Sequence, residues 1–257
     1  MKPAVCVLRT DGTNCDEETA YAFEKVGGKS HLVHVNELRS GSRRLRSYQI
    51  LAIPGGFSYG DDIAAGKILA VELISYLRDE LEGFVSRESL TIGICNGFQV
   101  LVRTGLLPFG RIGEMQVTLA PNDSGHFGCR WISMVAKWPS RCVFTQGIGE
   151  PIELPVAHGE GKFFTDPTAL ELLEVDNLVA LRYVEDGKAT VRYPANPNGS
   201  LASIAGICDH TGRIFGLMPH PERFVEETQH PNWRRKKFAR PHGLAIFENA
   251  IRYAADL

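Results

Sequence analysis

The chain has 257 residues, of which 44% are hydrophobic and 23% charged, the mixture of an ordinary globular protein. Its 28 Lys and Arg against 30 Asp and Glu leave a net charge of −2, which argues against binding nucleic acid through bulk positive charge. No apolar run reaches the roughly 20 residues that cross a bilayer, and the N-terminus lacks a signal-peptide pattern. We therefore expect a cytoplasmic protein that binds neither nucleic acid nor a membrane.

The first half of the sequence alternates between strand and helix patterns. The strand patterns lie at 4–8, 31–35, 50–53 and 91–94, and the helical ones at about 16–26, 64–85 and from 98 onwards. Residues 11–14 are rich in turn formers that can cap the first helix. Such alternation is typical of a parallel sheet with helices on both faces, which predicts three layers.

After about Pro108 the pattern changes to short strands separated by turns, with no long helical pattern among them. These strands are expected at 117–119, 131–135, 152–156, 178–183, 203–207 and 214–217, before a last helix at 242–254. We interpret them as added strands, partly antiparallel, that extend the parallel sheet. The sequence shows no repeat and no linker, so we expect one domain over residues 1–257.

Six cysteines are scattered along the chain, and none forms a Cys-x-x-Cys pair. In a reducing compartment this predicts free thiols and no structural metal site. Cys95 stands out because it lies in a Gly-x-Cys-x-Gly pattern between a predicted strand and a predicted helix. Such a nucleophile elbow places the thiol at the sheet edge and near a helix N-terminus, which favours the reactive thiolate. The alternative is a small buried side chain beside two turn glycines.

A base for Cys95 is offered by His220, which follows the strand pattern at 214–217. Glu222 lies two residues later, so in an extended backbone the two side chains share a face. A carboxylate beside an imidazole fixes its tautomer and stabilises the imidazolium. Cys95, His220 and Glu222 are thus a candidate triad, although His-Pro-Glu can also be a surface turn. His158 is the rival base.

Glycine-rich loops follow other strand patterns. The loop Pro54-Gly55-Gly56 lets backbone amides approach a ligand, so the Gly56 amide and the Asn96 amide are candidates for an oxyanion hole. The loop lacks the Gly-Lys-Ser/Thr ending of a phosphate-binding loop. Taken alone, Pro-Gly-Gly is usually only a turn.

The blocks of sequence around these residues resemble the class I, triad glutamine amidotransferases. The combination is similar, more narrowly, to the glutaminase subunits of phosphoribosylformylglycinamidine synthase. The blocks that carry the resemblance are Gly12-Thr13-Asn14-Cys15-Asp16, Gly55-Gly56-Phe57-Ser58-Tyr59-Gly60-Asp61, Ile94-Cys95-Asn96-Gly97-Phe98-Gln99, His158-Gly159-Glu160-Gly161, Asn196-Pro197-Asn198-Gly199-Ser200 and His220-Pro221-Glu222-Arg223.

The resemblance implies a flavodoxin-like fold and a defined chemistry. Cys95 would attack the side-chain amide of glutamine, and His220, oriented by Glu222, would protonate the departing ammonia and then activate water. Gly56 and Asn96 would hold the oxyanion. The positions that grip the amino-acid end of glutamine in the family correspond to Gln99, Gly159 and Glu160.

The resemblance also implies partners. Ammonia would pass to a synthetase subunit that uses ATP and Mg²⁺ to convert formylglycinamide ribonucleotide to formylglycinamidine ribonucleotide in de novo purine synthesis, and a small third subunit would bridge the complex. No cofactor or metal is expected on this chain. A freestanding cysteine hydrolase or peptidase of the same scaffold is the alternative function, and a non-catalytic binding module is a third.

The segment 226–240 goes beyond the ending expected of short family members. Its basic run, residues 234–237, is typical of a solvated face. Our alternative hypothesis is that this run docks against an acidic surface of the synthetase.

Overall fold

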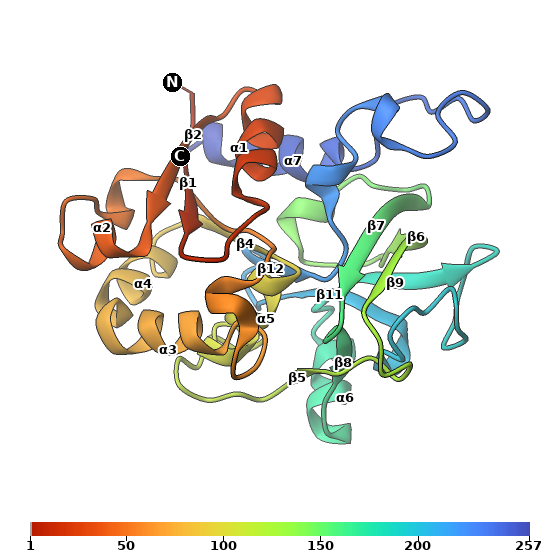
Figure 1. Cartoon of the computed structure of the whole chain (residues 1–257), viewed down its shortest axis with the longest axis horizontal. Coiled ribbons are helices and arrows are strands. Elements are labelled where there is room, and N and C mark those ends of the chain that lie inside the picture. Colours follow the sequence, from red (N-terminus) through yellow and green to blue (C-terminus); the bar gives the residue numbers. More distant parts are fainter. Residues whose placement is uncertain (1) are drawn as a thin grey trace.

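The computed structural model describes residues 2–257, and it has three layers with a ten-stranded mixed sheet in the middle (Figure 1). One half of the sheet is parallel. Its neighbouring strands are, in order, β2 (Lys29–His34), β1 (Ala4–Arg9), β3 (Ile50–Ile53), β4 (Leu90–Ile94) and β12 (Ile214–Leu217). β3 and β4 are buried along their whole length, which is why their sequences are apolar without alternation.

The other half of the sheet is antiparallel. It continues from β12 through β11 (Ile204–Cys208), β9 (Val179–Glu185), β6 (Gly128–Ala136) and β7 (Ile152–His158), and β10 (Lys188–Ala189) pairs with β9. β5 (Thr118–Ala120) and β8 (Lys162–Phe164) form a separate pair. The predicted α/β fold with a mixed sheet is confirmed. Two of the strands expected to be added to the sheet behave differently from the rest: β12 is parallel to β4 and belongs to the parallel half, and β5 lies outside the main sheet. The other added strands are antiparallel.

Helices cover both faces of the parallel half. They are α1 (Asp16–Lys25), α2 (Val35–Arg39), α3 (Lys67–Tyr76), α4 (Arg78–Val85), α5 (Asn96–Thr104) and α7 (Leu244–Ala255). α6 (Pro167–Val175) lies near β8, away from the parallel strands (Figure 1). α1 packs on α7 through Phe23 and Phe247, whose ring centres lie 4.9 Å apart, while α5 contacts α3 and strands β3, β4 and β12 (Figure 1). None of the helices described within residues 2–257 has the length and apolar character needed to cross a membrane.

Three helix predictions need correction. The long helix expected at 64–85 is two helices, which are separated at Leu77. The expectation that no helix lies among the later strands is wrong, because α6 is there; Asp166 accepts hydrogen bonds from the Thr168 and Ala169 amides and Pro167 begins the helix, a start signal visible in the sequence. The N-cap of α1 is Cys15, without a side-chain cap, rather than a residue of 11–14.

The strand order brings four chain segments to one edge of the sheet. β1, β3, β4 and β12 are parallel neighbours, so their carboxyl ends lie side by side. The segments that follow them carry Cys15, Gly56, Cys95 and His220 respectively. Residues that are up to 205 positions apart in sequence thus meet at this edge, the usual ligand position in an open α/β sheet.

Candidate active site

Cys95 occupies a strained turn between β4 and α5. Its φ is 51° and its ψ −105°, a conformation that side chains rarely adopt. The two flanking glycines are required for packing: a Cβ on Gly97 would lie 1.8 Å from the Ile53 carbonyl oxygen, and a Cβ on Gly93 would lie 2.5 Å from the Gly97 carbonyl oxygen. The turn therefore has the geometry of the elbow that the sequence predicted, and it holds the thiol at the N-terminus of α5.

His220 and Glu222 follow β12, the parallel neighbour of β4. His220 Nδ1 lies 2.5 Å from Glu222 Oε1, and the two residues are 1% and 0% exposed. Burial alone would lower the pKa of His220, but the Glu222 carboxylate and Cys95 raise it well above its usual range. This favours an imidazolium at rest. Nε2 is also buried, and within residues 2–257 it has no hydrogen-bond partner, so it remains free for proton transfer.

Gly55 packs against the side chains of both Cys95 and His220. A Cβ at this position would be 2.7 Å from His220 Cε1, 3.3 Å from Cys15 Sγ and 3.4 Å from Cys95 Cβ. The side chains of Cys95, Cys15 and His220 therefore all pack close to Gly55, which has no side chain to separate them.

Cys15 is a further buried thiol at this point, which the residue pattern alone did not assign to the site. Its Sγ and donor atoms of His220 and Glu222 lie within 4.8 Å of one another. Arg223 Nη2 lies 3.1 Å from Cys15 Sγ. The same guanidinium donates from Nε to Glu18 Oε1 at 2.9 Å. Burial raises the pKa of the Cys15 thiol, so it stays protonated. The sequence signals for Cys15 were its loop position after β1 and its place in one of the blocks that carry the resemblance.

The two candidate oxyanion-hole amides lie next to Cys95: Gly56 shares its pocket, and Asn96 directly follows it in the chain. Asn96 is also the first residue of α5. Neither backbone N–H donates a hydrogen bond to another group within the described chain, residues 2–257. Gly56 has a φ of 128°, which explains why a glycine stands there. Two free amides beside a thiol are what an oxyanion hole requires.

The pocket itself has a volume of about 260 Å³ and brings together the three residues expected to bind substrate. Gln99 projects from the first turns of α5, and its side-chain amide donates to the Glu160 carbonyl oxygen. The lining residues are Gly56, Phe57, Gly60, Asp61, Ala65, Cys95, Gln99, Phe127, Ala157, His158, Gly159 and Glu160. A space of this size suits a small polar molecule rather than a folded polypeptide segment.

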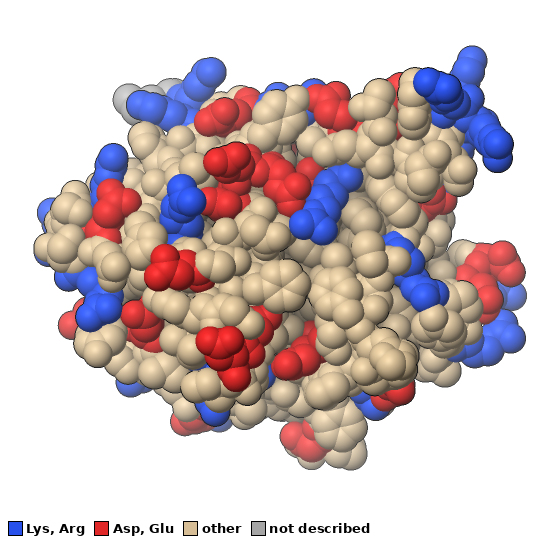
Figure 2. Space-filling model, in the orientation of Figure 1, with Lys and Arg blue, Asp and Glu red and all other residues tan. Residues whose placement is uncertain are grey.

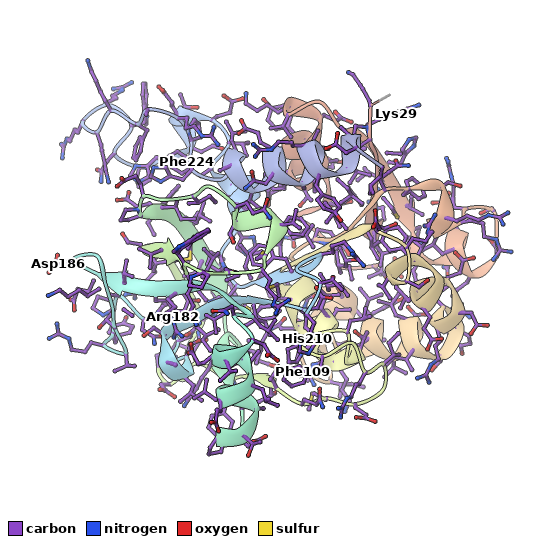
Figure 3. The ribbon with its side chains drawn as sticks, turned by 180° about the vertical axis from the view of Figure 1, so that it is seen from behind. Lys29, Phe109, Arg182, Asp186, His210 and Phe224 are labelled. Atoms are coloured by element: carbon purple, nitrogen blue, oxygen red, sulfur yellow. The ribbon has the colours of Figure 1, made fainter. Side chains whose placement is uncertain are left out.

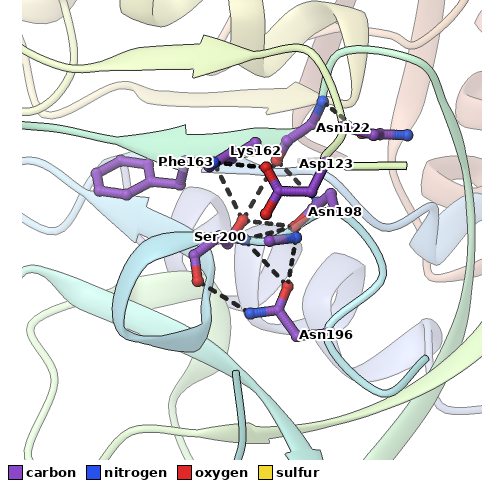
Figure 4. Close-up of polar contacts among 9 residues, drawn as sticks. Asn122, Asp123, Lys162, Phe163, Asn196, Asn198 and Ser200 are labelled. Carbon is purple, nitrogen blue, oxygen red and sulfur yellow. Dashed lines mark hydrogen bonds and ion pairs between the residues drawn. The ribbon is translucent and has the colours of Figure 1, made fainter. Parts of the chain in front are cut away.

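A network of buried amides supports the loop at 158–161 (Figure 4). The Asn122 side chain donates to the His158 carbonyl at 2.8 Å and accepts from the Gly161 amide at 3.1 Å. The Asn198 side chain donates to the Gly161 carbonyl at 2.8 Å and accepts from the Ser200 hydroxyl at 2.7 Å. Most of the block at 196–200 is buried, and its side chains hold the loop that borders the pocket.

His158 has a structural setting within this network. Its Nδ1 lies 3.1 Å from Asn122 Oδ1, and its side chain is buried. Burial and the nearby His220 lower the pKa of His158 to about 3, so it is a weak base. The geometry therefore favours His220 over this rival as the partner of Cys95.

Comparison with known proteins identifies the family of the chain. A family model described as a CobB/CobQ-like glutamine amidotransferase domain matches residues 2–254. The chain is 49% identical to phosphoribosylformylglycinamidine synthase subunit PurQ of Dehalococcoides mccartyi over 100% of this chain and 99% of the relative. The chain belongs to the PurQ family of glutamine amidotransferases. PurQ of Methanococcus maripaludis is 41% identical over 98% of this chain and 97% of its own length.

The fold comparison leads to the same family. A chain of the structure of PurLQS from Thermotoga maritima matches with a TM-score of 0.75 and 33% identity, covering 98% of this chain and 99% of that chain. The resemblance stated from the sequence blocks is confirmed, and so is the assignment to the glutamine amidotransferase component of phosphoribosylformylglycinamidine synthase.

The basic run at 234–237 lies on an excursion that projects from the body of the protein, where Figure 2 shows a cluster of basic side chains at one corner. Phe224 lies at the base of this excursion (Figure 3) and contacts the rings of His230, Phe238 and His242 at centre distances of 5.1–5.3 Å. Lys236 forms an ion pair with Glu153, whereas the other three basic residues, Arg234, Arg235 and Lys237, are exposed.

Proposed function

We propose that Cys95, His220 and Glu222 are the catalytic triad of a glutaminase subunit. The observation that carries this proposal is the meeting of a strained, glycine-flanked thiol with a buried His–Glu pair whose Nε2 is free. Cys95 Sγ attacks the side-chain amide carbon of glutamine, and the amides of Gly56 and Asn96 hold the developing oxyanion. One such donor contributes on the order of 3–4 kcal/mol to the transition state.

His220 moves the protons of both half-reactions. It gives its proton to the amide nitrogen as the C–N bond breaks, which releases ammonia and leaves a γ-glutamyl thioester on Cys95. The neutral imidazole then takes a proton from water, the hydroxide attacks the thioester, and glutamate leaves as the thiolate re-forms. Glu222 keeps Nδ1 protonated throughout, so Nε2 is always the atom that exchanges protons. Gln99, Gly159 and Glu160 hold the amino-acid end of the substrate.

We further propose that residues 1–257 form one class I glutamine amidotransferase domain that works in the cytoplasm as part of a complex. The relatives' name indicates phosphoribosylformylglycinamidine synthase, and the structure it resembles is PurLQS. On this basis a synthetase subunit, which binds ATP and Mg²⁺, receives the ammonia and makes formylglycinamidine ribonucleotide in purine synthesis, and a small subunit bridges the two. No nucleic acid, membrane or cofactor takes part on this chain.

The test measures glutamate released from glutamine by the chain alone and with its synthetase partners, ATP and formylglycinamide ribonucleotide. We expect weak release alone, strong release in the complex, and none above background for Cys95→Ala. Cys129→Ala is the matched control, because that thiol is exposed and outside the site. Equal release by wild type and Cys95→Ala in the complex would refute the proposal. Cys95-dependent cleavage of a peptide instead would favour the freestanding hydrolase.

We propose that the exposed basic residues of the excursion dock against an acidic surface of the synthetase. Charge reversal at Arg234, Arg235 and Lys237 tests this without breaking the ion pair of Lys236 with Glu153. We expect the complex to weaken at least tenfold and its salt dependence to flatten. Unchanged affinity for the synthetase would show that these side chains only face solvent.

A further inference from the structure

Asp61 is an acidic residue of the pocket that the proposed chemistry leaves without a role. It ends the 3-10 turn Ser58–Asp61 that follows β3, and it lines the pocket together with Cys95 and Gln99. Its Oδ1 accepts hydrogen bonds from the Asn96 side chain at 2.9 Å and from the Gly66 amide at 3.2 Å. The carboxylate is thus fixed against the residue that directly follows the nucleophile.

The other carboxylate oxygen is free. Among residues 2–257, no group donates a hydrogen bond to Asp61 Oδ2, and no Lys, Arg or His forms an ion pair with this side chain. The pocket has two acidic lining residues, Asp61 and Glu160, and no Lys or Arg among its described lining residues. Arg103 lies 3.8 Å from Glu160 and its charge also favours the Asp61 carboxylate, but within residues 2–257 it forms no ion pair with Asp61.

A fixed, unpaired carboxylate in a substrate pocket is unfavourable until a cation arrives. Burial raises the pKa of Asp61, which is the sign of that penalty. Free glutamine carries an α-ammonium at the end opposite to the amide that Cys95 attacks. A glutamine residue inside a peptide, or an acylated glutamine, has no such charge.

We infer that Asp61 binds the α-ammonium of the substrate and restricts the pocket to free glutamine. This inference rests on the proposed glutaminase function and adds the group that selects the substrate. A charge-assisted hydrogen bond of this kind, when removed, lowers kcat/KM about 10- to 100-fold, because the ammonium and its partner are both left poorly solvated.

Asp61→Asn isolates the charge, because an asparagine oxygen can still accept from Asn96 and Gly66. The neighbouring Asp62→Asn is the matched control, since Asp62 is exposed and does not line the pocket. Ammonia release by the complex is measured with glutamine and with 4-carbamoylbutanoate, which is glutamine without its α-amino group. We expect Asp61→Asn to lower kcat/KM for glutamine 10- to 100-fold, mainly through KM, and to leave the analogue within about twofold of wild type.

The outcomes separate the two proposals. An equal loss for both substrates, or no loss for either, would overturn the role of Asp61. Absence of Cys95-dependent ammonia release from wild type would instead refute the glutaminase function itself.

A second measurement needs no turnover: the glutamine concentration that protects Cys95 from alkylation by iodoacetamide should rise 10- to 100-fold in Asp61→Asn and stay unchanged in Asp62→Asn. An unchanged value in both variants would also overturn the inference.

Discussion

A single methyl group at Gly55 should slow the enzyme strongly while leaving it folded. The Cβ of Gly55→Ala would lie 2.7 Å from His220 Cε1, whereas the Cys95 Cβ is at 3.4 Å, an ordinary contact distance. To relieve the overlap, the imidazole must move by about 3.4 − 2.7 = 0.7 Å. His220 is held by Glu222 and is fully buried, so its displacement changes its position relative to the Cys95 thiol.

Misplacement of a reacting group by about 1 Å costs roughly 100-fold in rate. We therefore expect Gly55→Ala to lower kcat for glutamate release by about 100-fold with a much smaller change in KM. Overpacking of a buried contact destabilises a protein by about 1–3 kcal/mol, so a folded variant with a lower melting temperature is expected. Glutamate release in the complex and thermal unfolding are the two measurements.

Gly83→Ala is the matched control. Gly83 lies inside α4, and a Cβ there meets no atom within 4 Å. The substitution should raise stability by about 0.5–1 kcal/mol through helix propensity and leave activity unchanged. If Gly55→Ala retained activity within twofold of wild type, the close packing of thiol, imidazole and glycine would not govern the reaction, and the reasoning would be wrong.

Three further predictions concern the surroundings of the site. Glu222→Gln should lower the pKa of His220 and reduce kcat roughly 10⁴-fold; NMR titration of the imidazole checks the first effect, and a pKa that stays raised would contradict it. Asn198→Ala leaves the Gly161 carbonyl without its 2.8 Å donor, so stability should fall by about 1–3 kcal/mol and KM for glutamine should rise, whereas a fall in kcat alone would argue against loop positioning. Burial raises the pKa of Glu153, but Lys236 and His230 lower it more, so the folded pKa lies below the unfolded value of about 4.3. The carboxylate therefore stabilises the fold at pH values above the unfolded pKa, and this stabilisation is lost as the pH falls through the lower folded pKa. Denaturant unfolding of Glu153→Gln should therefore differ from wild type at pH 7 and converge with it below about pH 4; a constant difference would contradict the ion pair's role.

Local patterns predicted the elements better than their limits. The apolar runs of β3 and β4 have no alternation because both faces are covered, and that signal is local. The single helix expected at 64–85 failed because apolar spacing continues across Leu77, where the backbone turns. α6 was missed although its Asp-Pro start is visible, because nine residues give too short a periodic pattern.

The sequence by itself determined the chemistry of this protein. Two of its features can be recognised from short stretches of sequence: the elbow of Cys95 between two glycines, and the pairing of His220 with Glu222 two residues later. Each of them depends only on residues that are neighbours in sequence. Only the tertiary structure decided which loops meet. It brought Cys15 and Asp61 to the same sheet edge and made His158 a weak base within an amide network. The physical reason is that strand order and burial set these distances and charges, and neither is encoded in a short stretch of chain.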